Sequence, residues 1–256
     1  MAENITSPLP RGTKLGGFSI LDQIGRGGFG ITYRATNAKG EIVAIKEYFP
    51  SDYARRTKNS FVLPAQDNQR YYFEGLKSFL LEANTLKSLP RQVGLVQIRS
   101  AFEKFGTAYC VMDYIEGEPL SSLVPRFINR DGQIPEVLLR NFISPICTAL
   151  EAVHSIGLVH RDVKPANVMI RRDDNSPVLI DFGAARLLGQ RPTSAAMFTQ
   201  KYAPIELFPN DASRRRFALT EGPWSDIYSL SIMLYEMMTL QTPADAMTRM
   251  SRFEKN

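Results

Sequence analysis

The segment HRDVKPAN, from His160 to Asn167, places three different polar groups within six residues. The Asp162 carboxylate can accept the proton of a hydroxyl, the Lys164 ammonium can neutralise a phosphate, and the Asn167 amide oxygen can bind a divalent cation. One interpretation is a polar surface turn between two strands. The other is a loop that handles a substrate hydroxyl, a phosphate and a metal ion together, and the rest of the chain must decide.

A second candidate site is the glycine-rich segment GRGGFG, which fits the pattern G-x-G-x-x-G. A dinucleotide-binding fingerprint requires a helix after the glycines, but residues 30–36 alternate as a strand and end in the turn signal at 37–40. This context predicts a glycine-rich hairpin over a nucleotide, with a merely flexible hairpin as the alternative. The absence of side chains lets backbone approach phosphate oxygens closely; the glycines concerned are Gly25, Gly27, Gly28 and Gly30.

A third candidate is Lys46, which ends the apolar run VAIK. A lysine among apolar residues is costly unless it is paired. Glu82, on the core-facing stripe of a helix predicted over 71–89, is the expected partner. Glu74 competes, although its place near the start of that helix also suits the helix dipole.

The elements that must position these residues divide the chain into two parts. In the first part, residues 1–14 are expected to form a loose polar tail and 47–68 an irregular excursion. After a crossing near residue 114, helical spacing predicts further helices over 136–156 and 225–240. Alternation predicts strands over 18–24, 30–36, 42–45, 98–102 and 108–112, and short strands over 157–159, 167–170 and 178–180.

Composition and charge narrow the class of protein. The chain has 256 residues, 44% of them hydrophobic, which is enough to bury a core. Its net charge of +5 is not gathered among aromatic residues, so an anionic small ligand fits better than nucleic acid. Cys110 and Cys147 lie in apolar runs and indicate thiols in a reducing compartment, here the cytoplasm. No stretch is apolar enough to cross a membrane, although a longer full-length protein could be membrane-anchored.

The motifs in their order resemble the signature set of the eukaryotic-type protein kinases. The resemblance rests on residues 25–32, 43–46, 160–167 and 181–183 and covers roughly residues 16–240. Lys164 is typical of the serine/threonine form, and the segments FGITY, DFGAAR and KYAPIE resemble bacterial members. The resemblance implies an α+β, bilobal fold: a tail over 1–15, an antiparallel-sheet lobe with one long helix over 16–113, and a mainly helical lobe over 114–256.

The same resemblance implies an ATP-dependent protein serine/threonine kinase that uses Mg²⁺, with Mn²⁺ as an alternative, and a protein substrate. The γ-phosphoryl group would pass to serine or threonine hydroxyls. Lys46 would hold the α- and β-phosphates and Glu82 would hold Lys46. Asp162 would orient the substrate hydroxyl, and Lys164 would neutralise the γ-phosphate. Thr199 would contact the side chains of Asp162 and Lys164. Asn167 and Asp181 would bind the metal.

Further positions are implied for the adenine and for the core around the loop. Leu86, Ile98, His160 and Phe182 would stack as a spine anchored by Asp226, so His160 is not expected to act as an acid or base. The adenine would lie among Thr32, Ala44, Leu120 and Met169, beside Met112, with its edge bonded by the backbones of Asp113 and Ile115.

The chain also departs from the family pattern. Pro204-Ile205 stand where Ala-Pro is usual, before a retained Glu206, and the 47–68 excursion is longer than usual. Pro119 and Ala166 replace carboxylates, which puts a preference for basic substrates in doubt. An arginine directly before the catalytic aspartate, here Arg161 before Asp162, is typical of kinases that are activated by phosphorylation. Thr193 and Ser194 are the expected phosphate acceptors.

Two other functions compete with an active protein kinase. A pseudokinase scaffold would bind nucleotide without turnover, but Lys46, Asp162, Asn167 and Asp181 are all present. A small-molecule kinase of aminoglycoside type shares the lobes but lacks a long segment such as 183–206.

The last predicted helix leads to an expectation about the end of the chain. Residues 225–240 are apolar all round, and such a helix needs cover on every side. We therefore expect a C-terminally truncated kinase that is poorly stable or that self-associates through this face. Glu206 is expected to pair with Arg249 or Arg252, or to remain solvated.

Overall fold

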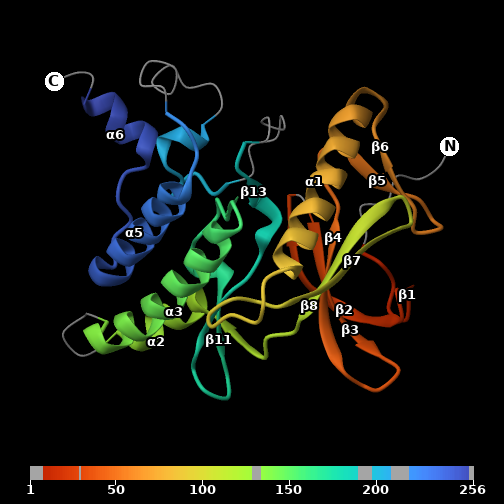
Figure 1. The fold of residues 1–256 in the computed structure, drawn as a ribbon, viewed down its shortest axis with the longest axis horizontal. Helices are drawn as coiled ribbons and strands as arrows, with labels where there is room; N and C mark the ends of the chain where they lie inside the picture. The colour runs from red at the N-terminus through yellow and green to blue at the C-terminus, as the bar shows by residue number, and fades with distance from the viewer. Residues whose placement is uncertain (1–7, 29, 129–133, 190–197, 209–218, 254–256) are drawn as a thin grey trace. The chain divides into compact units, whose positions relative to one another are not determined.

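A computed structural model describes residues 8–28, 30–128, 134–189, 198–208 and 219–253 (Figure 1). The chain forms two compact units. The first consists of Met1–Pro90 and Val96–Ile115, and the second of Arg91–Leu95 and Glu116–Asn256. The main boundary therefore lies within two residues of the predicted crossing.

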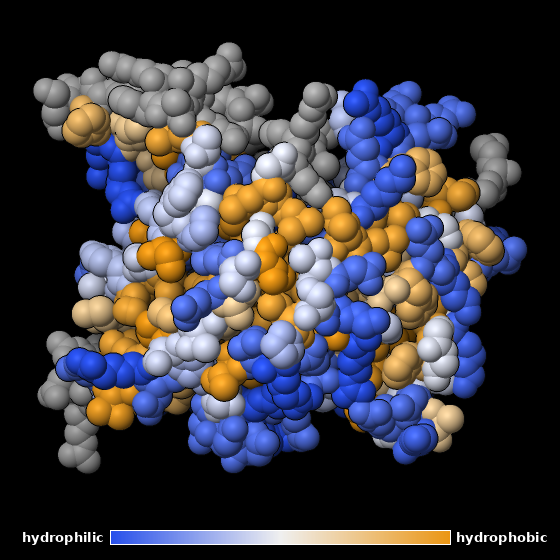
Figure 2. Space-filling model, in the orientation of Figure 1, coloured by the Kyte–Doolittle hydropathy of each residue, from blue (hydrophilic) through white to orange (hydrophobic). Residues whose placement is uncertain are grey.

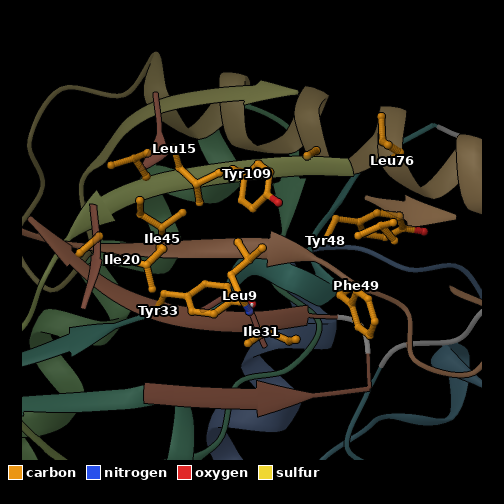
Figure 3. Packing of buried hydrophobic residues seen from close by; sticks show 14 of the residues in the cluster. Leu9, Leu15, Ile20, Ile31, Tyr33, Ile45, Tyr48, Phe49, Leu76 and Tyr109 are labelled. Carbon is orange, nitrogen blue, oxygen red and sulfur yellow. Dashed lines mark hydrogen bonds between the residues drawn. The ribbon is translucent and has the colours of Figure 1, made fainter. Parts of the chain in front are cut away.

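The first unit is built on an antiparallel sheet whose strands follow the order β1-β2-β3-β4-β8-β7. Alternation of apolar residues gives the sheet one fully buried face, which Ile31, Tyr33 and Ile45 line (Figure 3). The helix α1, Gln69–Lys87, packs against β7 and β8 and buries Tyr72 and Leu76. The strands are β1 Lys14–Leu15, β2 Phe18–Gly27, β3 Gly30–Asn37, β4 Ile42–Tyr48, β7 Ile98–Lys104 and β8 Thr107–Asp113.

The expectation of a loose N-terminal tail is wrong for the part that the structure describes. Leu9 is buried in the core of the first unit, and its N–H donates a hydrogen bond of 3.0 Å to the Tyr33 hydroxyl (Figure 3). Leu15 is fully buried in β1, which pairs with β2. Leu9 and Leu15 are isolated apolar residues in a polar segment and give no periodicity. The hydrophobic pattern therefore did not predict that either side chain is buried.

The excursion over 47–68 is also more regular than expected. Its strands β5, Ala54–Arg56, and β6, Val62–Pro64, pair as a short hairpin, and a 3₁₀ turn, Gln66–Asn68, leads into α1. Glu47, fully buried on β4, holds the hairpin because it accepts two hydrogen bonds from Arg56, of 3.0 and 2.6 Å. The hydroxyls of Tyr33 and Tyr109 each donate to the same carboxylate at 2.8 Å.

The second unit is mainly helical, as predicted. Its helices α3 and α5 pack against each other (Figure 1). The unit also contains two small sheets, in the orders β12-β11-β9 and β10-β13. No helix in the described part of the chain is long and apolar enough to cross a membrane. The helices are α2 Leu120–Phe127, α3 Glu136–Ser155, α5 Pro223–Thr239 and α6 Ala246–Phe253, and the strands are β9 Gly117–Pro119, β10 Leu158–Val159, β11 Val168–Arg171, β12 Pro177–Leu179 and β13 Arg186–Leu187.

The helix α5 is apolar on most sides but is covered on only some of them. Leu230, Met233 and Met237 are buried in the core of the second unit. Trp224 and Met238 are more than half exposed. The space-filling view shows apolar residues at the surface among polar ones on the face that it draws (Figure 2).

Candidate active site

The four residues predicted to surround the transferred group in the second unit lie together. The Asp162 carboxylate receives a hydrogen bond of 2.6 Å from Lys164 Nζ and one of 3.0 Å from Asn167 Nδ2, both on Oδ2. Its Oδ1 receives the Thr199 N–H at 3.0 Å and the Thr199 hydroxyl at 2.7 Å. Lys164 Nζ also donates to Thr199 Oγ1 at 2.6 Å, so the ammonium bridges the two residues. The loop is therefore a compact polar site and not a solvated surface turn.

Asn167 is oriented in a way that suits a metal ligand. Its Nδ2 donates both to the Asp162 carboxylate and to the Asp162 backbone carbonyl, the latter at 2.8 Å. These two bonds fix the amide plane and leave its Oδ1 as an acceptor. Because the Ile180 N–H donates to the Asn167 carbonyl at 2.9 Å, the next residue, Asp181, lies nearby. An amide oxygen and a carboxylate are the hard ligands that Mg²⁺ prefers.

Asp181 has a left-handed backbone, with φ of 65°. Such a conformation is uncommon for residues other than glycine and persists where the surroundings impose it. Here the carboxylate compensates locally, since Oδ1 accepts a hydrogen bond of 3.1 Å from the Gly183 N–H and caps the short helix Phe182–Ala184.

His160 is buried, and its ring contacts the backbone on both sides of the site. Its Nε2 lies 3.1 Å from the Ile180 carbonyl, and its Nδ1 accepts the Asp162 N–H at 3.3 Å. The ring packs edge-on against Phe182, with centroids 4.5 Å apart. Asp226, at the start of α5, accepts the N–H groups of His160 and Arg161 at 2.8 and 2.7 Å, as the predicted anchor should.

The other two residues of the predicted spine, Leu86 and Ile98, are both buried in the first unit.

The predicted partners of Glu206 are wrong: among the described residues, Glu206 forms no ion pair with Arg249 or Arg252. It is buried and accepts a hydrogen bond of 2.7 Å from the Ser225 hydroxyl. Arg249 lies instead against the ring of Tyr228.

The predicted phosphate and adenine residues of the first unit share one face of its sheet. Thr32 lies directly opposite Lys46, and Ala44 lies opposite Met112 two residues further along. Because alternate residues of a strand point to the same side, all four side chains point to the face opposite Ile31, Tyr33 and Glu47. Asp113, the last residue of β8, follows Met112 and therefore alternates to the other face, where Arg99 Nε donates to its carboxylate at 2.6 Å.

Glu82 occupies the predicted place on α1. It is buried in the same unit as Lys46, and its Oε1 accepts a hydrogen bond of 2.8 Å from the Ser78 hydroxyl. Its pairing with Lys46 stays a prediction. Glu74, the competing acid, is exposed and pairs with Arg70 at 2.8 Å.

The glycines of the predicted phosphate loop serve two different purposes. A side chain at Gly27 or Gly28 would meet no neighbour within 4 Å, so these positions leave open space beside the turn. A Cβ at Gly30 would lie 2.7 Å from the Glu47 carbonyl, so this glycine allows β3 to approach β4. The Gly28 carbonyl accepts the N–H and hydroxyl of Ser51, at 3.0 and 3.2 Å, which ties the turn to the start of the excursion.

The predicted adenine residues of the second unit differ in accessibility. Met169 is half-buried on β11, opposite Pro119 on β9. Leu120, the next residue, is fully buried in the core of this unit. Ile115, whose backbone is predicted to bond the adenine edge, ends the first unit, and its side chain is buried.

Sequence reasoning missed several charged residues near the site. Glu236 of α5 accepts Lys201 Nζ at 2.5 Å and the Tyr202 hydroxyl at 2.6 Å, which anchors the segment that follows Thr199. Glu221 pairs with Arg161 and Arg186. Their partners are distant in sequence, so no local pattern marks either glutamate.

Comparison with known proteins agrees with this arrangement. The model of the protein kinase domain family matches residues 18–256. Serine/threonine-protein kinase PknA of Nostoc is 28% identical over 90% of this chain and 38% of its own length. Serine/threonine-protein kinase Pkn1 of Myxococcus xanthus is 30% identical over 91% of the chain and 30% of its own length. The chain thus spans well under half of these curated relatives.

A solved structure gives the same result for the fold. The apo form of PpkA-294 superposes with a TM-score of 0.76 at 27% identity, covering 95% of this chain and 83% of that one. Family match, fold and site geometry agree, and the chain belongs to the protein kinase domain family.

Proposed function

We propose that this domain is a serine/threonine protein kinase that transfers the γ-phosphoryl group of ATP to protein hydroxyls. The observation that supports this most directly is the set of four hydrogen bonds on the Asp162 carboxylate, donated by Lys164, Asn167 and Thr199. A carboxylate held in this way is oriented to accept a hydroxyl proton, and it has an ammonium 2.6 Å away to balance phosphate charge.

The four bonds also set a condition for substrate binding. A carboxylate offers about four acceptor positions, so an incoming hydroxyl must replace one of the present donors. Lys164 is the donor best suited to leave Asp162, because its side chain is flexible. Phosphate oxygens would offer the Lys164 ammonium an equally strong partner. Asp162 Oδ2 would then accept the substrate hydroxyl while Thr199 still holds Oδ1.

Asn167 Oδ1 and the Asp181 carboxylate would bind Mg²⁺, which supplies charge neutralisation at the phosphates when bound. Lys46, steadied by Glu82, would hold phosphate oxygens. Thr32, Ala44, Met112 and Met169 would contact the adenine, with Leu120 packed behind it and the backbones of Asp113 and Ile115 at its edge.

The proposed location is the cytoplasm, because Cys110 and Cys147 are both free thiols.

Self-association through the exposed side of α5 is a further proposal. Light scattering tests it by comparing the molecular mass of the wild-type protein with that of a Met238→Glu variant.

Phosphotransfer with radiolabelled ATP, Mg²⁺ and casein tests the function. We expect label on serine and threonine of casein. Asp162→Ala should lower turnover by about 10²- to 10⁴-fold, the usual loss when a general base is removed, with nearly unchanged ATP affinity. ATP binding without any transfer would instead indicate a pseudokinase scaffold. Transfer to an aminoglycoside but not to protein would indicate a small-molecule kinase.

A further inference from the structure

The last residue of β4, Tyr48, packs against α1 within the first unit. Its side chain is buried, and its ring lies 5.4 Å from the ring of Tyr72 and 5.8 Å from that of Phe79, measured between centroids. Tyr72 and Phe79 are seven residues apart, so both belong to one side of the helix. The tyrosine ring therefore lies between successive turns of α1.

Gly75 lies between these two aromatic residues along α1, and the Tyr48 hydroxyl covers it. A Cβ atom on Gly75 would collide with Tyr48 Oη and would lie 3.0 Å from Cζ. A glycine inside a helix is unfavourable relative to alanine, and the backbone of Gly75 is helical, so its conformation does not require glycine. The glycine instead allows the close approach of α1 to the phenol.

This contact lies on the same faces of α1 and β4 as the two charged residues that are predicted to pair. On α1, Gly75 and Glu82 are seven residues apart and so lie on one side of the helix. On β4, Lys46 and Tyr48 are alternate residues, whose side chains point to the same side of the sheet. Burial is the main cause that raises the pKa of the Tyr48 phenol, and the negative charge of Glu82 is among the nearby groups that add to this rise.

Tyr48 has little freedom to move away from the helix. Its carbonyl accepts the hydroxyl of Thr107 on β8, and its backbone pairs with Gly30 on β3. The Tyr72 hydroxyl donates to the Gly106 carbonyl at 2.7 Å, so one of the two enclosing rings is itself fixed to the turn before β8. A helix that came closer would collide with the phenol, and a helix that moved away would lose the ring contacts.

We infer that the contact between Tyr48 and Gly75 sets the separation of α1 from β4, and that both are positioning residues for phosphotransfer. They act through Glu82, because its place relative to Lys46 depends on that separation. The inference rests on the proposed kinase function and on the predicted pairing of Lys46 with Glu82.

The first test adds one methyl group at the contact. Gly75→Ala places a carbon atom where the Tyr48 hydroxyl lies, so α1 must shift. We expect kcat with MgATP and casein to fall by about 10²-fold, the loss that follows when a group is misplaced by an ångström. The Kd for ATP should change less than about threefold, because the residues proposed to contact the adenine lie outside α1. Calorimetry gives this Kd and the number of binding sites per molecule, and kcat is expressed per binding site.

The second test removes the collision. Tyr48→Phe deletes the hydroxyl, and a Cβ on Gly75 then has its nearest ring atom at 3.0 Å, a distance that a small shift relieves. The double variant should have a kcat at least about tenfold above that of Gly75→Ala, whereas Tyr48→Phe alone should lower kcat by a few-fold. Asn84→Ala, exposed on the opposite side of α1, is the matched control and should act as wild type. Equal kcat values for Gly75→Ala and the double variant would overturn the inference.

These variants also separate positioning from packing alone. Alanine is favoured over glycine in a helix, so without the contact Gly75→Ala would raise the melting temperature and leave kcat unchanged. A purely structural role would lower the melting temperature and the number of binding sites, but not kcat per site. Either result overturns the inference and leaves the kinase function standing.

Tyr48→Leu decides if Gly75→Ala does not fold. It withdraws the ring without adding bulk to α1, and kcat per binding site should fall by about tenfold because the separation of α1 from β4 is no longer fixed. An unchanged kcat per site would overturn the inference. Absence of transfer to casein by the wild-type protein would instead refute the proposed function itself.

Discussion

Thr199 donates two hydrogen bonds to the same oxygen of Asp162, one from its N–H at 3.0 Å and one from its hydroxyl at 2.7 Å. The hydroxyl also accepts from Lys164 at 2.6 Å. Thr199 therefore fixes both the carboxylate and the ammonium from a segment far along the chain. This relationship makes the threonine hydroxyl, and not the loop alone, responsible for the orientation of Asp162.

Replacing Thr199 with valine removes the hydroxyl but keeps the shape of the side chain. We expect kcat to fall by about 10- to 100-fold, because hydrogen bonds to charged groups contribute about 1.5–3 kcal/mol. Thr199→Ser, which retains the hydroxyl, should stay within a few-fold of wild type. Steady-state kinetics with casein measure both, and equal kcat values for the two variants would contradict this role.

Asp181→Ala should act on metal-dependent binding of nucleotide. The carboxylate is one of two hard ligands that we assign to Mg²⁺, so its loss should abolish the gain in ATP affinity that Mg²⁺ gives. Calorimetry with ATP, with and without Mg²⁺, measures that gain. In Asp162→Ala the gain should persist, and a normal Mg²⁺ effect in Asp181→Ala would rule out the assignment.

The buried charges of the first unit give a prediction about stability. Glu47→Gln leaves Arg56 buried without its counter-charge and should cost about 3–5 kcal/mol in the free energy of unfolding. Adding Arg56→Met to that variant should recover part of the loss, because the stranded cation is gone. Urea titration measures all three proteins. Asp22→Asn, in the exposed pair with Arg34, is the control and should cost less than about 1 kcal/mol.

Additive losses from Glu47→Gln and Arg56→Met would contradict this account of the cluster. A double variant less stable than Glu47→Gln alone would mean that the two side chains stabilise the fold through separate contacts.

The two thiols should differ in reactivity. Burial raises the pKa of Cys110 to about 12, so its thiolate is scarce at pH 8 and its sulfur is inaccessible. Burial also raises the pKa of Cys147, but this residue is exposed on α3. Titration with a disulfide reagent should therefore show one fast thiol in the native protein and a second only after unfolding. Two fast native thiols would contradict the packing of β8.

Sequence predicted the elements with strong periodicity and the loops with distinctive motifs. The strands around Lys46 and the helix that carries Glu82 lie within a few residues of their predicted ranges, because alternation and helical spacing persist over many residues. The hairpin over 54–64 was missed because each strand has only three residues and because its stability comes from Arg56 reaching a buried glutamate.

Within the site, sequence could predict the residues of continuous motifs but not the partners that hold them. Asp162, Lys164 and Asn167 follow each other closely, and their motif is distinctive. The resemblance predicts that Glu206 pairs with Arg249 or Arg252, or remains solvated, yet the start of α5 places the Ser225 hydroxyl there. Such pairings depend on where two distant segments meet, which no local pattern records.

The cluster around Glu47 also bears on how the first unit is made during synthesis. The hydrogen-bond partners of this carboxylate lie 9, 14 and 62 positions away along the chain, at Arg56, Tyr33 and Tyr109. On the ribosome, Tyr33 and Arg56 are available early, whereas Tyr109 emerges last and carries β8, which pairs with β4 and β7. Contacts of such long separation form late. A nascent chain halted before β8 would thus expose the unpaired edges of β4 and β7 to chaperones. The first unit would complete its sheet only after β8, with Tyr109, has been synthesised.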